Sequence, residues 1–385
     1  MAGLLHNPPL ALYVHMPWCV RKCPYCDFNS HAAPESLPAE EYIHALVADL
    51  EQDLPLVWGR PVQSVYFGGG TPSLFSADHI ALFLSEVRAR LDLRPGLEIT
   101  LEANPGTIEH DNFSAYAQAG INRVSLGVQS FDDDVLKRLG RIHGRHEIEQ
   151  SLQSLDLAGI SNFNIDLMYA LPGQSPARSR RDIELAIGAK PAHISFYQLT
   201  IEPNTAFAAQ PPRLPPDDEA WDMQQTGIDM LGAAAFSQYE ISAFAQADMQ
   251  SRHNMNYWRY GDFLAVGAGA HGKITTPADG KVQRYVKHRH PRRYLKGPES
   301  GDWLAERRFL TRGELVFEFF LNQLRLKQGV NIDDFSVRTG LPWQVVESRV
   351  QQAIDKGLVE VDQHHVKTTG LGWKFVNDIQ QMFLP

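Results

Sequence analysis

Short apolar runs alternate with amphipathic stretches from the start of the chain to about residue 200, and few folds accommodate that pattern. The runs are rich in β-branched and aromatic residues, so we expect strand–helix units joined by right-handed crossovers into a parallel sheet. The expected strands cover 12–14, 64–67, 97–102, 123–128, 163–167 and 193–199. The expected helices cover 39–54, 77–91, 109–119, 133–139, 147–158 and 178–187.

Six such units fit either an open doubly wound sheet or most of a β/α barrel. A doubly wound dinucleotide fold calls for Gly-x-Gly-x-x-Gly after a strand, whereas residues 68–73 read GGGTPS and end on Ser73. A polar or glycine-rich segment follows every expected strand. Turn chemistry accounts for each such segment taken alone, but together they suit the loops at the carboxyl ends of barrel strands. We therefore expect an incomplete (β/α)6 barrel of the TIM type, with the site on those loops.

The pattern changes in the second half of the chain. Two proline pairs, Pro211-Pro212 and Pro215-Pro216, indicate a linker, and a helix over 217–236 and a seventh short strand over 239–241 follow it. The basic stretch 281–296 is expected to be a solvated connector.

The last 80 or so residues look like a small separate domain. Apolar periodicity predicts a helix over 314–326, and alternation predicts a hairpin over 358–368. Further helices are expected over 332–337, 344–353 and 374–383. This order resembles a winged helix of the α+β class. We divide the chain into a barrel over 1–245, a segment with a connector over 246–302, and the winged-helix-like domain over 303–385.

Charge and composition limit the partners and the compartment. The net charge of −9 argues against nucleic acid, so docking or lid duty is the better expectation for the tail. No N-terminal segment combines basic residues, an apolar core and a cleavage site. Reduced thiols suit the cytosol, so we expect a cytoplasmic protein that meets membranes only through partners.

The only three cysteines, Cys19, Cys23 and Cys26, follow the first expected strand within one short loop. An odd number cannot form a disulfide framework, so the group predicts a metal site. A zinc site with His15 or His31 as the fourth ligand is one possibility. The spacing lacks a second cysteine pair, and three soft thiolates suit three irons of a 4Fe-4S cluster with one iron left open.

The spacing Cys-x3-Cys-x2-Cys after a strand resembles the signature of radical S-adenosylmethionine (SAM) proteins. In that family SAM chelates the open iron through its amino and carboxylate groups. Residues 68–72, GGGTP, resemble the family's glycine motif for the methionine moiety of SAM.

A closer resemblance, over roughly the first 200 residues, is to the oxygen-independent coproporphyrinogen III dehydrogenase group. Its motifs appear in order at 13–17, 68–72, 101–105, 127–130, 139–141 and 164–167. That resemblance implies a SAM pocket lined by Tyr13, Tyr25, Gly70, Thr71, Glu102, Gln129, Arg141 and Asp166.

One departure from the motifs of the dehydrogenases distinguishes the subgroups of this group. The dehydrogenases carry a further cysteine two positions after the third, where this chain has Phe28. Residues 26–30 and the motif His253-Asn254-x-x-Tyr257-Trp258 instead resemble the HemW haem chaperones, over essentially the whole chain. This implies binding of haem and its delivery to haem-accepting proteins, such as respiratory or haem-storage proteins, without classical turnover. The dehydrogenase activity is the alternative.

His253 is the candidate haem ligand, because Met255, Tyr257 and Trp258 beside it offer an apolar, aromatic surface. A hydrogen-bonded packing role for this histidine is the competing interpretation. His143 and His271 are weaker candidates. An incompletely ligated cluster near the surface also leaves room for a homodimer bridged there.

Overall fold

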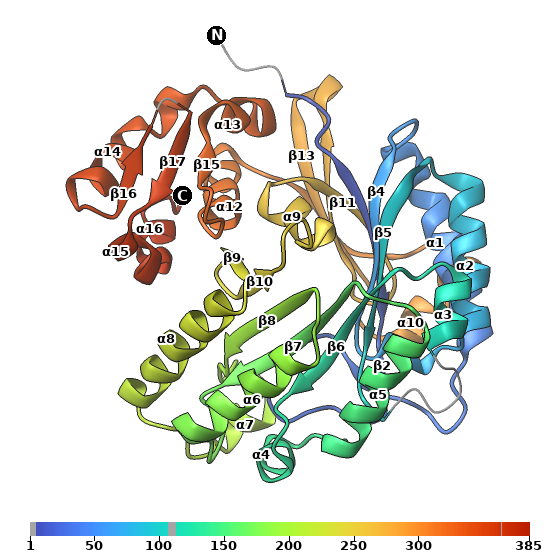
Figure 1. Ribbon diagram of the computed structural model, residues 1–385. Coiled ribbons are helices and arrows are strands. Elements are labelled where there is room, and N and C mark those ends of the chain that lie inside the picture. The colour runs from blue at the N-terminus through green and yellow to red at the C-terminus, as the bar shows by residue number, and fades with distance from the viewer. Residues whose placement is uncertain (1–4, 107–112, 363) are drawn as a thin grey trace.

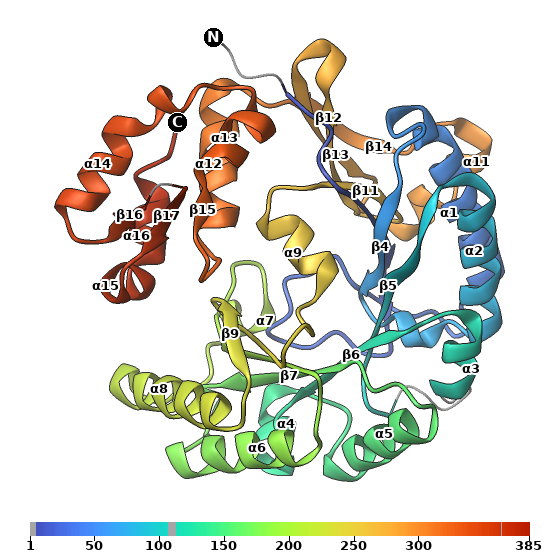
Figure 2. The same cartoon turned by 45° about the horizontal axis from the view of Figure 1, so that its top comes forward.

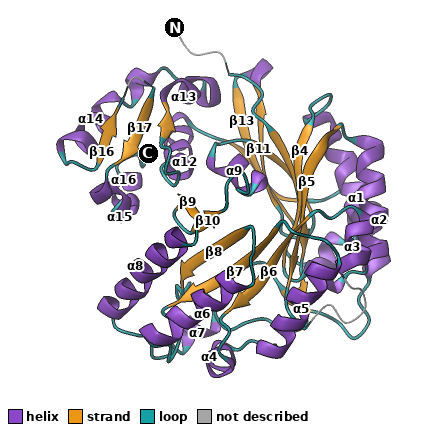
Figure 3. Cartoon of the chain, viewed as in Figure 1, coloured by secondary structure: helices purple, strands orange, loops and turns teal. Residues whose placement is uncertain are grey.

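The computed structural model describes residues 5–106, 113–362 and 364–385 and is built around one large curved sheet (Figures 1 and 3). The sheet has 12 strands in the order β14-β13-β12-β11-β1-β4-β5-β6-β7-β8-β10-β9. The parallel strands that follow the chain are β1 Leu10–Met16, β4 Val62–Gly69, β5 Leu93–Ala103, β6 Arg123–Gln129, β7 Phe163–Tyr169 and β8 His193–Gln198. All six strands expected from the sequence are present.

Helices cover the outer, convex side of this sheet (Figure 2). They are α1 Ala39–Asp53, α2 Ala77–Arg90, α3 Phe113–Ala119, α5 Arg145–Leu157, α6 Pro176–Gly188 and α8 Asp217–Ala233, with α4 Asp133–Leu139 at the rim. The helix expected over 109–119 is present from Phe113, and its first four residues lie outside the described part of the chain. Side-chain caps begin several helices, as at Asp132 before α4 and Ser175 before α6.

The strands are buried on both faces, which explains why they read as continuous apolar runs. All seven residues of β6 are buried, and six of the seven in β1. Helices pack on the outer face, and inward side chains meet in the concave interior, as expected for a parallel sheet.

The barrel is open. On one side β1 pairs with β11 Asp262–Val266, and the antiparallel strands β12 His271–Thr276, β13 Lys281–Lys287 and β14 Leu304–Phe309 extend the sheet beyond it. On the other side β8 pairs with β10 Ala243–Ala245, which pairs with β9 Ser237–Glu240. The incomplete parallel barrel predicted from the sequence is confirmed, and the seventh short strand is β9.

The prediction of a solvated connector over 281–296 is wrong for its first half. Residues 281–287 form β13 inside the large sheet, and Lys287 is fully buried. Its Nζ contacts Asp49 and lies 2.7 Å from Asp53 Oδ2, both on α1. A buried lysine is stable when carboxylates pair with it. The large sheet therefore continues through the 246–302 segment as β11, β12 and β13.

The C-terminal domain has the predicted helices and wing. It contains α12 Arg312–Gln323, α13 Ile332–Thr339, α14 Glu347–Asp355 and a three-stranded sheet of β15 Val330–Asn331, β17 His365–Thr368 and β16 Val359–Val361. The last helix is divided into α15 Gly370–Lys374 and α16 Val376–Gln381. Phe319, Phe320 and Phe335 lie at the centre of a separate apolar core.

This domain lies beside the open side of the curved sheet, and the short helix α9 Arg252–Trp258 lies inside the curve (Figure 2). Arg325 pairs with Glu240 at 3.0 Å, and the Tyr260 and Phe319 rings meet with centroids 5.8 Å apart. These contacts join the domain to the barrel. In the described part of the chain, no helix has the length and apolar character needed to cross a membrane.

Candidate metal and cofactor site

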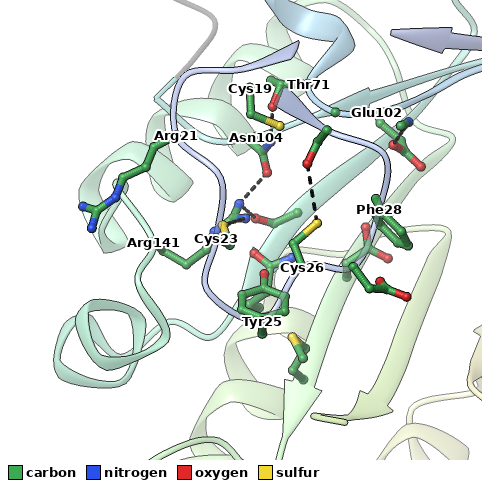
Figure 4. Close-up of a pocket in the computed structure, with 18 of the residues that line it drawn as sticks. Cys19, Arg21, Cys23, Tyr25, Cys26, Phe28, Thr71, Glu102, Asn104 and Arg141 are labelled. Carbon is green, nitrogen blue, oxygen red and sulfur yellow. Dashed lines mark hydrogen bonds between the residues drawn. The ribbon is translucent and has the colours of Figure 1, made fainter. Parts of the chain in front are cut away.

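The loop that leaves β1 carries the three cysteines to the carboxyl end of the sheet. Its backbone is held by a short parallel pairing of β2 Trp18–Cys19 with β3 His31–Ala32. Cys19, Cys23 and Cys26 are all partly exposed and line one cavity of about 270 Å³ (Figure 4).

Nearly all of the residues predicted to bind SAM line the same cavity. They are Tyr25, Gly70, Thr71, Glu102, Gln129, Arg141 and Asp166. Tyr13, in the middle of β1, does not line this cavity. Its hydroxyl is 3.0 Å from His15 Nδ1, and its ring centroid is 6.3 Å from that of His253.

The glycine motif at the end of β4 packs backbone against backbone. Gly70 N–H donates to Met16 O at 2.7 Å, and a Cβ on Gly70 would lie 2.6 Å from Trp18 O. Gly69 has a φ of 112°, and a Cβ there would lie 2.5 Å from the His15 ring. Both positions require glycine because the cysteine loop begins directly against them.

Arg141 connects the cysteine loop to the rim of the sheet. Its Nη2 donates to Gly127 O at 3.0 Å and to Asn104 Oδ1, while Nη1 lies 3.4 Å from Cys23 Sγ (Figure 4). Asn104 in turn donates to Thr71 Oγ1 at 3.0 Å. Arg141 thus ties the cysteine loop to the end of β6 and to Asn104 after β5.

Glu102 is a buried carboxyl at the wall of the cavity. It accepts hydrogen bonds from Tyr66 Oη at 2.7 Å and from Gly69 N at 3.1 Å. Burial raises the pKa of Glu102 to about 7, and the nearby Asp166 carboxylate also raises it. The group therefore changes charge near neutral pH and is poised to respond to a cationic ligand.

Two further groups complete this wall. Asp166 accepts from Asn164 Nδ2 at 2.9 Å and from Ser125 Oγ at 3.1 Å, and burial raises its pKa. Gln129 adopts a φ of 63°, and its Oε1 is buried without a hydrogen-bond partner among the described residues. An orphaned amide oxygen beside a cavity is costly unless a ligand donates to it.

The donor set fits a cluster with SAM better than a single zinc ion. His15 Nε2 bonds Asn29 O at 2.8 Å, and neither His15 nor His31 lines the cavity. Within the described ranges, no three His, Cys, Asp or Glu side chains are grouped so that they could hold one ion. A cluster spaces its cysteines more widely, because each thiolate binds a different iron. The three cysteines, the unsatisfied amide of Gln129 and the two carboxyls fit a cluster with SAM.

Apolar side chains surround the opening of this cavity. Val20, Phe28 and Ile142 line it and are 53%, 61% and 51% exposed. Phe28, at the position where a fourth cysteine would stand, thus lies at the opening rather than in the core.

His253 is placed on α9, away from the cysteines, and is 1% exposed. Its Nδ1 is 3.0 Å from Ser64 Oγ and its Nε2 is 3.1 Å from Tyr257 Oη, while its backbone N–H donates to Glu98. The ring stacks on Tyr66 with centroids 4.7 Å apart, and burial lowers its pKa to about 3. In this conformation neither ring nitrogen is available to iron.

The other two histidines proposed for haem differ in burial. His143 is buried, its Nε2 lies 3.3 Å from Val128 O, and its Nδ1 has no hydrogen-bond partner among the described residues. His271 is exposed at the start of β12.

Some lining residues were not singled out from the sequence. Asn104 is followed by a proline and reads as a turn, and Tyr197 lies in a strand and reads as core. A conserved position would have been the useful signal, and a single sequence does not carry it.

The parallel half-barrel and the cysteine pocket at the carboxyl ends of its strands define a radical SAM protein. The family model described as the Radical SAM superfamily matches residues 13–186, and the HemN C-terminal domain matches residues 310–375. Coproporphyrinogen III oxidase HemN from Escherichia coli has a similar structure, with a TM-score of 0.82 over 98% of this chain and 90% of that one. The two are 24% identical, so this likeness shows the fold.

Closer relatives define the family. The heme chaperones HemW of Haemophilus influenzae and Escherichia coli are each 45% identical to this chain, with 98% of both chains covered. HemW of Bacillus subtilis is 31% identical over 97% of this chain and 98% of its own length. The chain belongs to the heme chaperone HemW family.

Proposed function

We propose that this protein binds haem and transfers it to an acceptor protein, and that it carries a 4Fe-4S cluster on Cys19, Cys23 and Cys26 with an exchangeable SAM. The observation that carries the cofactor part is the single cavity that joins the three thiols to Gln129 and to two buried carboxyls. Family membership supports the haem part. Thiols that stay reduced suit the cytoplasm, and the acceptors would be respiratory or haem-storage proteins.

The chain's own residues would orient SAM in this cavity. Arg141 is placed to pair with a carboxylate, because its guanidinium already reaches the rim beside Cys23. Glu102 and Asp166 offer carboxyl oxygens to an amine or to ribose hydroxyls, and Gln129 Oε1 accepts a further hydrogen bond. Bound SAM would complete the coordination of the open iron.

His253 remains the proposed haem ligand on the strength of its motif, and the structure defines what ligation requires. Because Ser64 and Tyr257 occupy its two nitrogens, α9 must move or the Tyr257 contact must be exchanged for iron. The low pKa keeps the imidazole neutral, which is the form that ligates iron.

The alternative function is oxygen-independent coproporphyrinogen III dehydrogenase, a radical SAM oxidoreductase. The shared fold and cavity favour it, and Phe28 at the place of the fourth cysteine speaks against it. It predicts multiple turnovers of coproporphyrinogen with formation of 5′-deoxyadenosine.

Haem titration of the anaerobically reconstituted protein, followed by transfer to an apo-haemoprotein, tests the proposal. We expect saturable haem binding that weakens at least about tenfold in His253→Ala and is retained in Tyr257→Phe, which frees Nε2 without removing the ring. Repeated turnover of coproporphyrinogen, or no saturable haem binding, would contradict the proposed function. Unchanged haem affinity in a folded His253→Ala protein would remove only His253 from the site.

A further inference from the structure

A second large cavity lies at the opposite end of the barrel from the cysteines, between the barrel and the C-terminal domain. It measures about 740 Å³. Residues at the amino ends of the strands form one wall, among them Pro9 before β1 and Gln63 near the start of β4. Helices α9 and α13 contribute the other walls through Asn256 and Asp334.

The cavity concentrates positive charge in an acidic chain. Its lining includes four arginines and two aspartates, namely Arg94, Arg252, Arg259, Arg338, Asp248 and Asp334. The whole protein carries a formal charge of −9, so this local excess of guanidinium groups is not a reflection of composition. The arginines come from β5, from both ends of α9 and from α13, so the fold brings them together from distant parts of the chain.

These guanidinium groups are poorly paired. The side chains of Arg94 and Arg259 make no ion pair or hydrogen bond with any residue in the described ranges, and Arg338 Nε is buried without a partner there. Burial is the main cause of the lowered pKa of Arg338. The Asp334 carboxylate raises this pKa, and the charge of Arg259 lowers it further. Arg252 donates once, to Gly96 O at 3.2 Å.

A neighbouring arginine, Arg60, has an ion pair and one hydrogen bond to the protein. Arg60 lines a smaller adjoining cavity of about 400 Å³, which Arg94 and Arg338 also line. Arg60 Nη1 lies 2.9 Å from Asp262 Oδ2, and Nη2 donates to Pro8 O at 2.7 Å. Arg60 is thus paired with a carboxylate, whereas the exposed Arg94 and the half-buried Arg338 have no ion-pair partner in the described ranges.

We propose that the larger cavity is a binding site for a small polyanion that carries at least two phosphate groups. A guanidinium pairs with phosphate through two parallel hydrogen bonds, and several arginines around one space select a ligand with several such groups. The volume lies within the range of small-molecule sites, about 300–1,000 Å³. Neutral donors are also present in the lining, namely Gln63, Gln250, Asn256, Gln323 and Asn331.

The ligand would bridge the two domains. Arg94 belongs to the barrel and Arg338 to the C-terminal domain, so a polyanion held by both joins them. A phosphoanhydride chain can come from a nucleotide or from an inorganic polyphosphate, and the probes must distinguish these sources.

Calorimetric titration of the full-length protein with pyrophosphate, tripolyphosphate and ATP at constant ionic strength tests the site. We expect one saturable site for at least one probe, weakened at least about tenfold in Arg94→Gln and in Arg338→Gln. The matched control is Arg181→Gln, because Arg181 is exposed on α6 and paired with Glu184 at 3.0 Å. Its affinity for the probe should equal that of the unmodified protein.

The outcomes separate clearly. Tighter binding of ATP than of tripolyphosphate assigns the site to a nucleotide, and equal binding assigns it to the phosphate chain. The proposal would be overturned if no probe bound saturably, or if both arginine variants bound the probe as tightly as the unmodified protein. Binding of only an acidic peptide or duplex DNA would also overturn it. If Arg338→Gln fails to fold, the exposed Arg94 position decides.

Discussion

The cysteine cavity and the surroundings of His253 are both polar regions of the barrel interior, yet they are built in opposite ways. At the cysteine cavity Gln129 Oε1 has no partner among the described residues, the thiols are partly exposed, and burial raises the pKa of Glu102. Around His253 both ring nitrogens are hydrogen-bonded and the ring is stacked on Tyr66. Unsatisfied polarity marks the place for a ligand, whereas saturated polarity marks a support that must rearrange to bind one.

Replacing a cysteine is expected to have the largest effect, which is the loss of the cluster from the cysteine cavity. Cys23→Ser should abolish cluster assembly, because only two thiolates remain and the serine hydroxyl beside Arg141 is a poor iron ligand. Iron and sulfide analysis after anaerobic reconstitution measures the loss. The circular dichroism spectrum should be unchanged, because Cys23 lies outside the apolar cores. Full iron content in the variant would exclude Cys23 as a ligand.

Removing His253 should reveal its supporting role. His253→Ala leaves the Ser64 and Tyr257 hydroxyls without their partner and opens a hole beside Tyr66, so we expect a loss of about 2–4 kcal/mol in the free energy of unfolding. Urea unfolding without haem measures it. His44→Ala, at an exposed position on α1, is the control and should change stability by less than about 0.5 kcal/mol. Equal effects of both substitutions would contradict the comparison.

A methyl group at the glycine motif should disturb the cysteine loop. Gly70→Ala places a Cβ 2.6 Å from Trp18 O, and relieving that overlap should cost about 1–3 kcal/mol and reduce the iron content after reconstitution. Gly188→Ala is the matched control, because a Cβ there would meet no atom within 4 Å. Wild-type iron content and stability in Gly70→Ala would show that the close contact is not required.

The smallest expected effect is a pH dependence set by Glu102. Its pKa is raised from 4.5 to about 7, so the folded protein favours the neutral carboxyl and loses that stabilisation as the pH rises from 4.5 through 7. Over the upper part of that range the ionised Glu102 carboxylate becomes a partner for a cationic group of SAM. Affinity for SAM should therefore rise several-fold, up to about tenfold, between pH 6 and pH 8. In Glu102→Gln the affinity should be flat over the same interval, and a wild-type profile in that variant would exclude Glu102 as the titrating group.

Local patterns predicted the sheet, and the family resemblance supplied most of the residues that line the cavity. Polar residues that follow parallel strands share one rim, so that rim could be predicted from the order of the strands. The assignment of Gln129 and Asp166 to a SAM pocket came from the family resemblance, and both line the cavity. Tyr13 was implied by the same resemblance but does not line the cavity, although it holds the position in β1 that Asp166 holds in β7.

Long-range pairing was not predictable in this way. Lys287 is separated from Asp49 by 238 residues, and nothing in the basic stretch 281–296 shows that its lysine enters a core. The same holds for His253, whose partner Ser64 is 189 residues away. Whether both ring nitrogens of a histidine are hydrogen-bonded depends on such distant partners, and the motif around the histidine does not reveal them.

The most direct test of the central claim is a SAM titration of the reduced, reconstituted protein followed by electron paramagnetic resonance. Three cysteine ligands leave one iron open, so we expect about four irons per chain and a cluster signal whose g-values shift as SAM binds. The shift should saturate in the wild type and be lost or greatly weakened in Arg141→Gln, which keeps all three cysteines. One zinc ion per chain, or a cluster signal that SAM does not change, would contradict it.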